Sequence, residues 1–508
     1  MEKNTLDALF ITNQNTDFQK IRKLTEKYRL RKLLFLTSHG LFRTEQKYLS
    51  DLFPGSSFMR FCDFISDQEM EECDNKASSN LLTQINSESV KRNYNYLFIR
   101  LSLENKNALI LEKLHAMYNI QSIYYSSGLG ISESVWKSSG GIPLSHPTFR
   151  FTHFSFGGFS RFYRGVSLLF SRSIVSIIRH ENNCFIFFSP TKRLNLETPV
   201  ESIRFLPFRH IFRSFPRISY PNLVNAYLDR YIGNNIKIII STGLHNYDYE
   251  LSQLKRPINI FVDGFHPSNY PKTYIDSFIS GEFVVRTMYD ELWFKKYRRN
   301  TIKPYPFLKK EYFKPVDTND ISIGTIVLLL NHAGDWTALI NRSDTDILIQ
   351  AFADAADKLK DHRFVIRPHP TMIHPLHEGK NSHERIRKFV NNCNLHNLSV
   401  SNKSLENDIA AGDIFISEYS QTLLDIFKAG KLGIIANITN RRSFMQDYEK
   451  LGFLTANNAE SICKLIFQIT ADPKKYTQIQ NNASMKYNDA LCKFYSEPPL
   501  HYNDPQAR

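Results

Sequence analysis

The sequence has few cysteines, and none of them are closely spaced. Its six cysteines, among 508 residues, form no C-x-x-C spacing, which argues against a zinc site and against a dense disulfide framework. The start of the chain, residues 1–12, has neither the basic segment nor the small-residue cleavage site of a secretory signal. No apolar run reaches the ~18 residues that span a bilayer. We therefore expect a cytoplasmic protein that is soluble or lies on a membrane surface.

Two glycine-rich nucleotide-binding motifs are also missing. The chain contains no G-x-x-x-x-G-K-[ST] sequence and no G-x-G-x-x-G fingerprint, so nothing supports a kinase or a dehydrogenase. No D-x-D pair stands at the end of an expected strand, so nothing calls for a catalytic metal. We expect neither a metal nor a cofactor.

Basic residues exceed acidic ones. The chain has 64 Lys and Arg residues against 50 Asp and Glu residues, a formal charge of +14. This excess suits nucleic acid, an anionic membrane or phosphorylated substrates, and composition alone does not rank them. Apolar residues make up 42% and charged residues 22%, as in ordinary globular proteins. The length exceeds what one hydrophobic core supports, so two or three domains are expected.

Short β-branched and aromatic runs alternate with helical patterns. Runs that are apolar throughout and alternate with helices indicate parallel sheets covered on both faces. One helix is predicted at 346–359, where Leu348, Phe352, Ala355 and Leu359 share a stripe. The expected strands are 6–12, 31–38, 96–101, 121–127, 236–242, 258–263 and 282–287, followed by 325–331, 363–367, 398–401, 413–417 and 432–436.

The pattern predicts an α/β protein with two doubly wound domains. A segment rich in proline and charge, 301–322, separates them, so we expect an N-terminal domain at 1–310, a C-terminal domain at 311–490 and a tail at 491–508. Two such domains facing each other form a ligand-binding cleft at their strand ends. Residues 137–220 interleave Phe and Tyr with Arg. This insertion packs on the first domain, docks on anionic lipid, or stacks on single-stranded nucleic acid.

The stretch FVIRPHP, 364–370, ends a predicted strand in polar residues. Arg367 carries a planar fork of donors that suits phosphate oxygens, and His369 can donate to a phosphate. Pro368 and Pro370 fix the backbone on both sides of the imidazole. Phosphate binding is the interpretation we favour, and a structural turn is the alternative.

The stretch DIFISEYSQTLLDIFKAG, 413–430, places hydroxyl groups at the start of a predicted helix. Ser420 or Thr422 lies beside free backbone N–H groups there, at the positive end of the helix dipole. A plain N-cap is the alternative. Together with R-P-H-P at the same sheet edge, it predicts the second half of a phosphate clamp.

The stretch INIFVDGFHP, 258–267, repeats the strand-then-histidine arrangement in the first domain. His266 would face the clamp across the cleft and remove a proton from an attacking hydroxyl. Asp263 would orient His266 or act as the base itself. The alternative is a turn histidine without a catalytic role.

These three motifs resemble those of cytoplasmic bacterial surface-polymer transferases, the CDP-glycerol glycerophosphotransferases and related capsule polysaccharide transferases. The resemblance covers roughly 235–455 and includes 283–297. The family usually has Trp-His-Gly where this chain has Phe265-His266-Pro267, and a second serine in place of Gln421. The resemblance implies a GT-B arrangement of two Rossmann-like domains.

The resemblance also implies residue roles. His369, Ser420 and Thr422 would hold the donor phosphates, and Glu418 would contact a ribose or sugar hydroxyl. His266 would activate the acceptor, which makes 1–310 the acceptor domain and 311–490 the nucleotide-donor domain. Asn331 and His332 would complete the donor pocket, with a loop that binds no ligand as the alternative.

The leading hypothesis is therefore a metal-independent transferase. It would move a sugar or polyol phosphate from a nucleotide-activated donor to a growing glycan or a lipid-linked glycan. The basic excess would hold it at the anionic inner face of the plasma membrane, and we do not expect nucleic acid as its partner. One alternative is a sugar-nucleotide epimerase on the same fold. The other is a non-catalytic protein that binds membrane or nucleic acid and retains a degenerate transferase fold.

Overall fold

The computed structural model divides the chain into two compact units. The first contains Met1–Ser79, Phe98–Phe149 and Phe313–Asn488, and the second contains Asn80–Leu97, Arg150–Tyr312 and Asp489–Arg508. The structure describes residues 3–13, 16–37, 42–84, 87–126, 132–144, 175–180, 183–188, 236–241, 258–261, 282–296, 301–303, 310–317, 323–330, 345–369, 380–418, 421–436 and 446–497.

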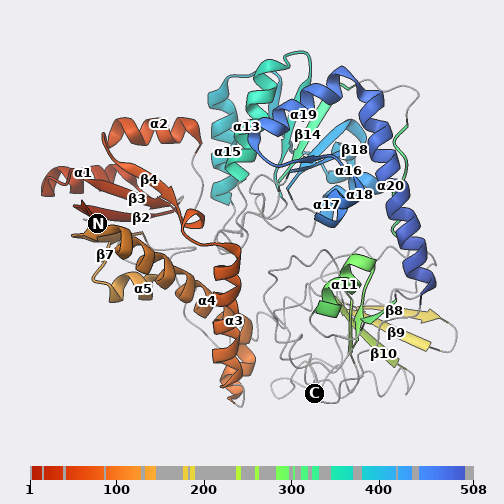
Figure 1. The fold of residues 1–508 in the computed structure, drawn as a ribbon, viewed down its shortest axis with the longest axis horizontal. Coiled ribbons are helices and arrows are strands. Elements are labelled where there is room, and N and C mark those ends of the chain that lie inside the picture. Colours follow the sequence, from red (N-terminus) through yellow and green to blue (C-terminus); the bar gives the residue numbers. More distant parts are fainter. Residues whose placement is uncertain are drawn as a thin grey trace, which may run out of the picture. The chain divides into compact units, whose positions relative to one another are not determined.

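The N-terminal sheet, in the first unit, is parallel throughout. Its strand order is β4-β3-β2-β6-β7, so the chain builds outward from β2 on one side and then on the other (Figure 1). Its apolar strands are buried because helices cover both faces. The strands are β2 (Ala8–Thr12), β3 (Leu33–Thr37), β4 (Ser57–Arg60), β6 (Ile123–Tyr125) and β7 (Ile142–Pro143). A separate parallel pair consists of β1 (Asn4–Leu6) and β5 (Tyr118–Ile120).

The helices of this region connect and cover the strands. They are α1 (Phe18–Tyr28), α2 (Arg43–Leu52), α3 (Asp67–Leu82), α4 (Glu88–Met117) and α5 (Glu133–Ser138), with a 3-10 turn at Phe61–Asp63. The strand expected at 96–101 is wrong, because these residues lie inside α4. The buried stripe of that helix, with a spacing of four, consists of Phe98, Ser102, Lys106, Ile110 and Leu114. A serine and a lysine interrupt the stripe, which hides its helical period and leaves a short apolar run that looks like a strand.

The middle sheet lies in the second unit. Its strand order is β13-β12-β11-β10-β9-β8, parallel except for the antiparallel β8–β9 pair. The strands expected at 236–242, 258–263 and 282–287 are present in it, and β8 and β9 fall within the expected insertion 137–220. The strands are β8 (Val175–His180), β9 (Asn183–Phe188), β10 (Ile236–Ser241), β11 (Ile258–Phe261), β12 (Phe283–Val284) and β13 (Thr301–Ile302), and α11 (Met288–Lys296) follows β12.

The strands of 1–310 that we expected to form one sheet are thus divided between the N-terminal and the middle sheet. Alternation of strand and helix indicates parallel pairing but does not say which strands pair. The domain boundaries at 310 and 490 remain predictions.

The C-terminal sheet, in the first unit, has the order β16-β15-β14-β17-β18-β19 and is parallel throughout. Numbered along the chain, this is the order 3-2-1-4-5-6 of a doubly wound dinucleotide-binding sheet. The α/β class with Rossmann-like sheets is therefore confirmed. The strands are β14 (Thr325–Leu329), β15 (Arg363–Arg367), β16 (Leu398–Val400), β17 (Ile414–Ser417), β18 (Leu432–Ala436) and β19 (Thr455–Ala456).

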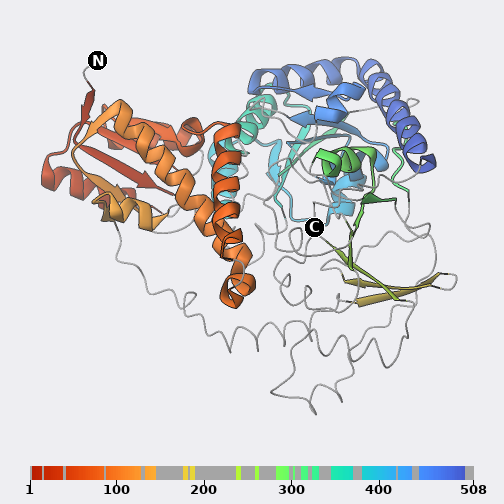
Figure 2. The same ribbon diagram turned by 60° about the horizontal axis from the view of Figure 1, so that its bottom comes forward.

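Helices cover both faces of this sheet (Figures 1 and 2). Among the described residues, no helix is long and apolar enough to cross a membrane. The helix expected at 346–359 is α13, and its predicted stripe is buried except for the half-buried Leu359. The helices are α13 (Thr345–Lys358), α15 (Lys380–Cys393), α16 (Leu405–Ala411), α17 (Gln421–Lys428), α18 (Gln446–Leu451), α19 (Ala459–Ala471) and α20 (Pro473–Ser496).

The expected linker is held firmly where it is described, at 310–317. Phe313 is 2% exposed and stacks on Tyr487 with ring centroids 3.9 Å apart. The Asn488 side chain accepts a hydrogen bond from the Phe313 N–H and donates one to its carbonyl, at 2.9 Å each. Asn481 binds Val316 in the same two-sided way. The segment is therefore bound to α20 through the backbone groups of Phe313 and Val316.

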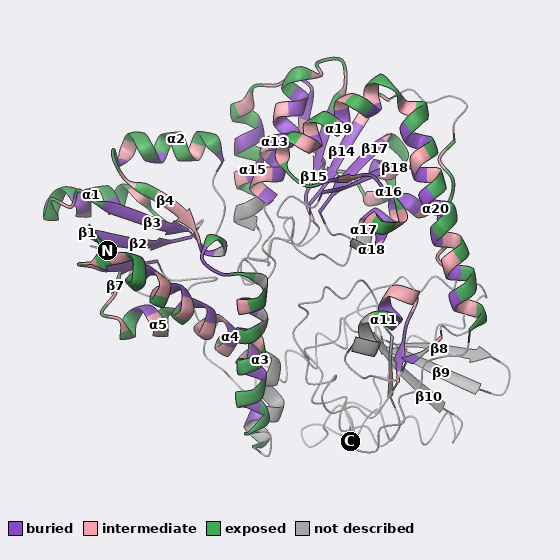
Figure 3. Cartoon of the chain, viewed as in Figure 1, coloured by how far each residue is buried: buried purple, intermediate pink, exposed green. Residues whose placement is uncertain are grey.

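One contact within the first unit joins the N-terminal sheet region to the C-terminal sheet. Phe42, just before α2, is 2% exposed and packs in the core under the C-terminal sheet, where it stacks on Phe389 at 4.2 Å. The Arg385 guanidinium lies 4.3 Å above the Phe42 ring and forms ion pairs with Glu45 of α2 and Asp346 of α13. Burial lowers the pKa of Arg385, but the two carboxylates outweigh it and raise the pKa overall. We call this contact the Phe42–Arg385 joint. Figure 3 colours the residues of α2, α13 and α15 by how far they are buried.

Removing the Phe42 ring should strongly destabilise the first unit. Phe42→Ala leaves a cavity beside Phe389 and Arg385, at an expected cost of ~3–5 kcal/mol in the free energy of unfolding. Urea unfolding followed by circular dichroism measures it. The matched control is Tyr48→Ala on the same helix, where the ring is 50% exposed and a change within about 0.5 kcal/mol is expected. Equal losses in the two variants would show that Phe42 is not a core residue.

Candidate functional site

The candidate site lies at the carboxyl edge of the C-terminal sheet. β14 is the first strand of this sheet and pairs with β15 on one side and β17 on the other. Leu329 is in register with both Arg367 and Ser417, so these three strand ends form one row. The connections leave β15 and β17 in opposite directions, which makes the β14/β17 boundary a topological switch point. Ligands of open parallel sheets bind outside the strand ends at such a point.

The sequence candidates of the C-terminal domain follow these three neighbouring strands. Arg367 ends β15 and His369 lies two residues beyond it, half-buried after the buried Pro368. Glu418 follows β17 and is 6% exposed, and Thr422 lies half-buried in the first turn of α17. The sheet therefore brings the described parts of the two motifs, residues 367–369 and 417–418, to one edge. Their roles in ligand binding remain predictions.

Several candidates lie outside the described residues. They are Asp263, His266, Asn331, His332 and Ser420. β14 ends at Leu329, so Asn331 and His332 follow the central strand of the row.

Arg367 has a structural partner at this edge. Its Nη1 donates to Asp408 Oδ2 at 2.5 Å and to the Lys403 carbonyl at 2.8 Å. The Asp408 side chain is 4% exposed and also accepts the Ser401 hydroxyl at 2.7 Å. The Ser401 N–H in turn donates to the carbonyl of Ile366. The Nη1 group of Arg367 thus fixes the loop after β16 to the end of β15. Fewer N–H donors of the guanidinium remain for a phosphate than the sequence suggests.

The sequence analysis did not identify Ser401 and Asp408. The available signal was an aspartate on the apolar side of a short helix, because Asp408 follows Leu405 by three residues in α16. A carboxylate in such a position needs a buried partner. Arg367 is that partner.

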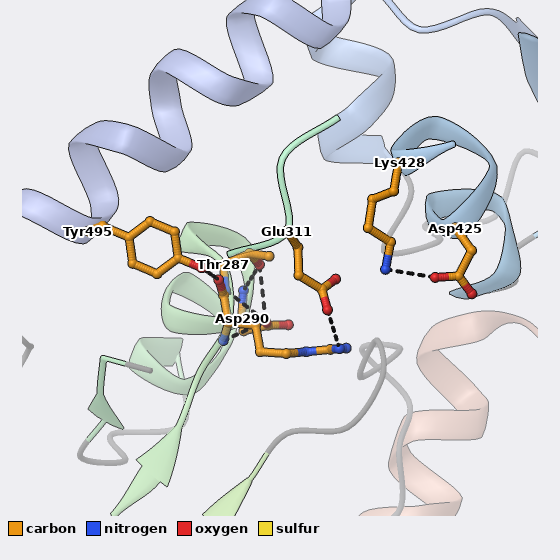
Figure 4. A network of polar contacts seen from close by, with 7 residues as sticks. Thr287, Asp290, Glu311, Asp425, Lys428 and Tyr495 are labelled. Atoms are coloured by element: carbon orange, nitrogen blue, oxygen red, sulfur yellow. Dashed lines mark hydrogen bonds and ion pairs between the residues drawn. The ribbon is translucent and has the colours of Figure 1, made fainter. Parts of the chain in front are cut away.

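The helix after β17 packs closely on the sheet. α17 ends at Lys428 and is followed by Gly430, which has a φ of 71°. The N–H groups of Gly430 and Lys431 donate to the carbonyls of Phe427 and Ile426. A glycine of positive φ just after the helix closes its last turn in this way. A Cβ on Gly433 of β18 would lie 2.5 Å from the Phe427 ring, so glycine lets the helix approach the strand. Asp425, at a position where the resembled family often has an aspartate, pairs with Lys428 at 2.7 Å (Figure 4).

The N-terminal sheet has a second switch point, between β2 and β6. Thr12 and Asn13, at the end of β2, are 0% and 3% exposed, and Ser126, after β6, is 6% exposed. The hydroxyls of Thr16 and Ser126 are hydrogen-bonded at 2.8 Å, and the Asn13 N–H donates to Thr16 at 2.9 Å. The T-N-Q-N-T sequence at 12–16 was the signal for this cluster. Hydroxyl and amide groups without formal charge suit a ligand that is rich in hydroxyls.

A cavity of about 140 Å³ lies beside the Phe42–Arg385 joint. It is smaller than the ~300–1,000 Å³ typical of ligand pockets, so it does not accommodate a nucleotide. Its lining residues are Thr37, Gln46, Phe58, Met59, Arg60, Asp346 and Ile347. Among the described residues, no group of three His, Cys, Asp or Glu side chains is arranged to hold a metal ion.

A buried polar network in the second unit joins Arg286, Thr287 and Asp290 to Glu311 and Tyr495 (Figure 4). Thr287 and Asp290 cap α11 reciprocally: the Thr287 N–H donates to Asp290 Oδ2 at 3.1 Å, and the Asp290 N–H donates to Thr287 Oγ1 at 3.2 Å. Arg286 pairs with Glu311 at 3.1 Å, and the Tyr495 hydroxyl donates to the Arg286 carbonyl. Burial raises the pKa of Asp290 to about 6, although Arg286 and the Thr287 donors lower it.

No protein-family model matches the sequence, and no curated protein matches it. Searches of solved structures found glycosyltransferases. HepE from Anabaena in complex with UDP and glucose is 10% identical, with a TM-score of 0.25, over 97% of this chain and 99% of that one. Heptosyltransferase WaaC from E. coli with ADP-2-deoxy-2-fluoro heptose is 10% identical, with a TM-score of 0.28, over 73% and 96%. The forosaminyltransferase SpnP is 10% identical, with a TM-score of 0.29, over 53% and 74%. Scores this low assign neither a fold nor an activity to this chain, and its fold follows from its own strand order.

Breaking the Arg367–Asp408 pair should destabilise the carboxyl edge of the C-terminal sheet. Asp408→Ala leaves a buried guanidinium without its carboxylate, at an expected cost of ~3–5 kcal/mol, measured by urea unfolding. Asp357→Ala is the matched control, because its pair with Lys360 is 65% and 46% exposed and should contribute less than about 1 kcal/mol. If Asp408→Ala costs no more than the control, the pair does not fix this edge.

Asp290 should make the stability of the second unit fall as pH rises. Its folded-state pKa of about 6 exceeds the usual aspartate pKa of 3.8, so between these two pH values the folded protein binds more protons than the unfolded one. Stability from Asp290 is therefore complete below pH 3.8 and lost as pH rises through about 6. The loss amounts to about 3 kcal/mol at most.

The difference between wild type and Asp290→Asn isolates this contribution, because other carboxyl groups titrate in both proteins. Amide hydrogen exchange of 282–296 between pH 4 and pH 7 would follow the segment directly. Parallel pH profiles in the two proteins would contradict the raised pKa.

Proposed function

We propose that the chain is a GT-B-type transferase that moves a sugar or polyol phosphate from a nucleotide-activated donor to a growing surface glycan, such as a capsule, an O-antigen or a teichoic-acid-like polymer. The observation that supports it is the shared edge: R-P-H-P and S-E-Y-S-Q follow β15 and β17, on either side of β14. That edge is where a parallel sheet of this order binds a nucleotide.

The donor would bind at the C-terminal sheet. We propose that His369, Ser420 and Thr422 hold its phosphates, and that the N-terminus of α17 adds backbone N–H groups and the positive end of its dipole. Glu418 would accept a hydrogen bond from a ribose or sugar hydroxyl, with Asn331 and His332 completing the pocket. Arg367 would keep β15 and the loop at 401–408 in place through Asp408, and contribute its positive charge.

The acceptor would bind within 1–310. We propose His266 as the base that takes the proton of the attacking hydroxyl, with Asp263 orienting it or acting as the base. The hydroxyl cluster of Thr12, Thr16 and Ser126 at the second switch point is a candidate for holding hydroxyl groups of the glycan. The acceptor oxygen then forms the new bond as the bond to the nucleotide phosphate breaks, and the leaving phosphate is stabilised at the clamp without a metal.

The basic excess favours an anionic donor and the inner face of the plasma membrane, where a lipid-linked acceptor would be held. We propose a cytoplasmic protein that is peripheral to that membrane. An epimerase on the same fold would turn over a nucleotide sugar without an acceptor. A non-catalytic protein with a degenerate transferase fold would bind RNA or vesicles regardless of nucleotide.

Donor binding tests the proposal. In a thermal-shift screen of CDP-, CMP-, UDP-, GDP- and dTDP-linked compounds, one class should raise Tm, since a ligand at 100 times its Kd stabilises by about 2.7 kcal/mol. His369→Ala should reduce that shift by removing a phosphate donor. His396→Ala is the matched control: His396 is exposed just before β16, at the amino edge of the same sheet.

Two results would contradict the clamp: a donor shift that His369→Ala leaves undiminished, or no shift with any nucleotide-linked compound. A donor that binds and is consumed without added glycan would favour the epimerase. Product formation only after a glycan or lipid-linked acceptor is added would favour the transferase.

A further inference from the structure

One helix of the N-terminal region carries an unusual density of exposed cations. Within 17–32, which covers α1 and the turn to β3, seven basic side chains stand against the two carboxylates Asp17 and Glu26, an excess of five. The seven exposed basic residues, here called the basic α1 face, are Lys20, Arg22, Lys23, Lys27, Arg29, Arg31 and Lys32.

The two carboxylates are engaged in local structure. Asp17 caps α1 by accepting the N–H groups of Gln19 and Lys20, at 3.0 and 3.2 Å. Glu26 pairs with Arg22 at 2.9 Å in an i,i+4 arrangement. The positive charge of the face is therefore only partly balanced by its own helix.

The opposite side of α1 fixes the orientation of this face. Ile21 is 1% exposed and packs in the core cluster with Phe10 and Phe35, and Leu24 packs against the same cluster. The helix is thus bound to the N-terminal sheet by its apolar side. Its basic side is turned to solvent, as the exposed colouring of α1 in Figure 3 shows.

Arg29, one of the seven residues of the basic α1 face, has an unfavourable backbone conformation. It ends α1 with a φ of 54°, in the left-handed region where glycine is the favoured residue. An arginine there is strained by its Cβ. Such local violations are expected where a side chain has a role outside the fold.

We propose that the basic α1 face docks the protein on the surface of an anionic lipid bilayer. Clusters of Lys and Arg are attracted to anionic headgroups, and this face places four cations on α1 and three in the turn that follows it. Tyr28, 56% exposed beside Lys27, supplies an amphipathic ring of the kind found at membrane interfaces. One tyrosine is not a stacking platform for single-stranded nucleic acid, so we favour lipid as the partner of this face.

This proposal rests on the proposed function, in which the protein is peripheral to a membrane. It assigns membrane attachment to the basic α1 face and not to the insertion 137–220. The test is co-sedimentation of the full chain with vesicles of phosphatidylglycerol and phosphatidylcholine, against vesicles of phosphatidylcholine alone. The variant Lys20→Gln/Lys23→Gln/Lys27→Gln should bind the anionic vesicles about tenfold more weakly or worse, given the attraction expected per cation. The control Lys474→Gln/Lys475→Gln/Lys486→Gln removes as many exposed cations from α20 and should bind like wild type.

A second variant separates binding from folding. Arg29→Gly relieves the strained backbone and removes one cation, so it should keep or raise Tm while it weakens vesicle binding. Loss of Tm together with binding would assign Arg29 a structural role alone.

Three results would overturn the proposal. The first is that the wild-type protein does not bind anionic vesicles. The second is that the α1 and α20 variants weaken vesicle binding equally, which would mean that binding depends on the net charge of the protein and not on the basic α1 face. The third is an α1 variant that loses poly(U) binding but not vesicle binding, which assigns the face to nucleic acid. The donor thermal shift, measured on the same variants, should not change, so failure of the docking surface is distinguishable from failure of the transferase proposal.

Discussion

Parallel pairing of β14 with strands on both sides is the constraint on which the candidate site depends. Because all three strands run in one direction, Arg367, Leu329 and Ser417 end in one row, and everything that follows them is delivered to the same edge. The chain leaves β14 towards β15 on one side and leaves β17 towards β18 on the other, so the β14/β17 boundary is the switch point of this sheet. The same constraint acts on β2 of the N-terminal sheet, where Thr12 and Asn13 at the strand end are polar although buried.

At the edge of the C-terminal sheet, the structural contacts of Arg367 change the interpretation that the sequence suggests. A guanidinium at a strand end suits phosphate, and the sequence points to Arg367 for that reason. In the structure, Asp408 and Ser401 take part of its hydrogen-bonding capacity and fix the loop after β16. A buried carboxylate paired with an arginine weakens the attraction of that arginine for an anion. We therefore expect the histidine and hydroxyl groups, and not Arg367, to determine donor affinity.

The sequence predicts the C-terminal sheet well for a physical reason. Strands buried on both faces are apolar at every position, so 363–367 and 432–436 are recognised to the residue. The failure at 96–101 has the opposite cause, since α4 buries Ser102 and Lys106 in its stripe and conceals its period. Lys106 is tolerated there because Asp74, distant in sequence, pairs with it at 2.7 Å. Partners brought together by folding, such as Asp408 for Arg367 or β2 for β6, leave no local pattern.

In the Phe42–Arg385 joint, one contact contributes most of the stability and another determines the orientation of the packing. The Phe42 ring contributes through burial, which has little preference for direction. Arg385 recognises Glu45 on α2 and Asp346 on α13 at once, and a buried ion-pair cluster of this kind contributes little net stability because desolvation opposes it. Its effect is on register: a shift of α2 along α13 that kept the ring buried would still leave a charge without its partner. The joint therefore selects one way for the N-terminal sheet region to pack on the C-terminal sheet, and the ring alone would not.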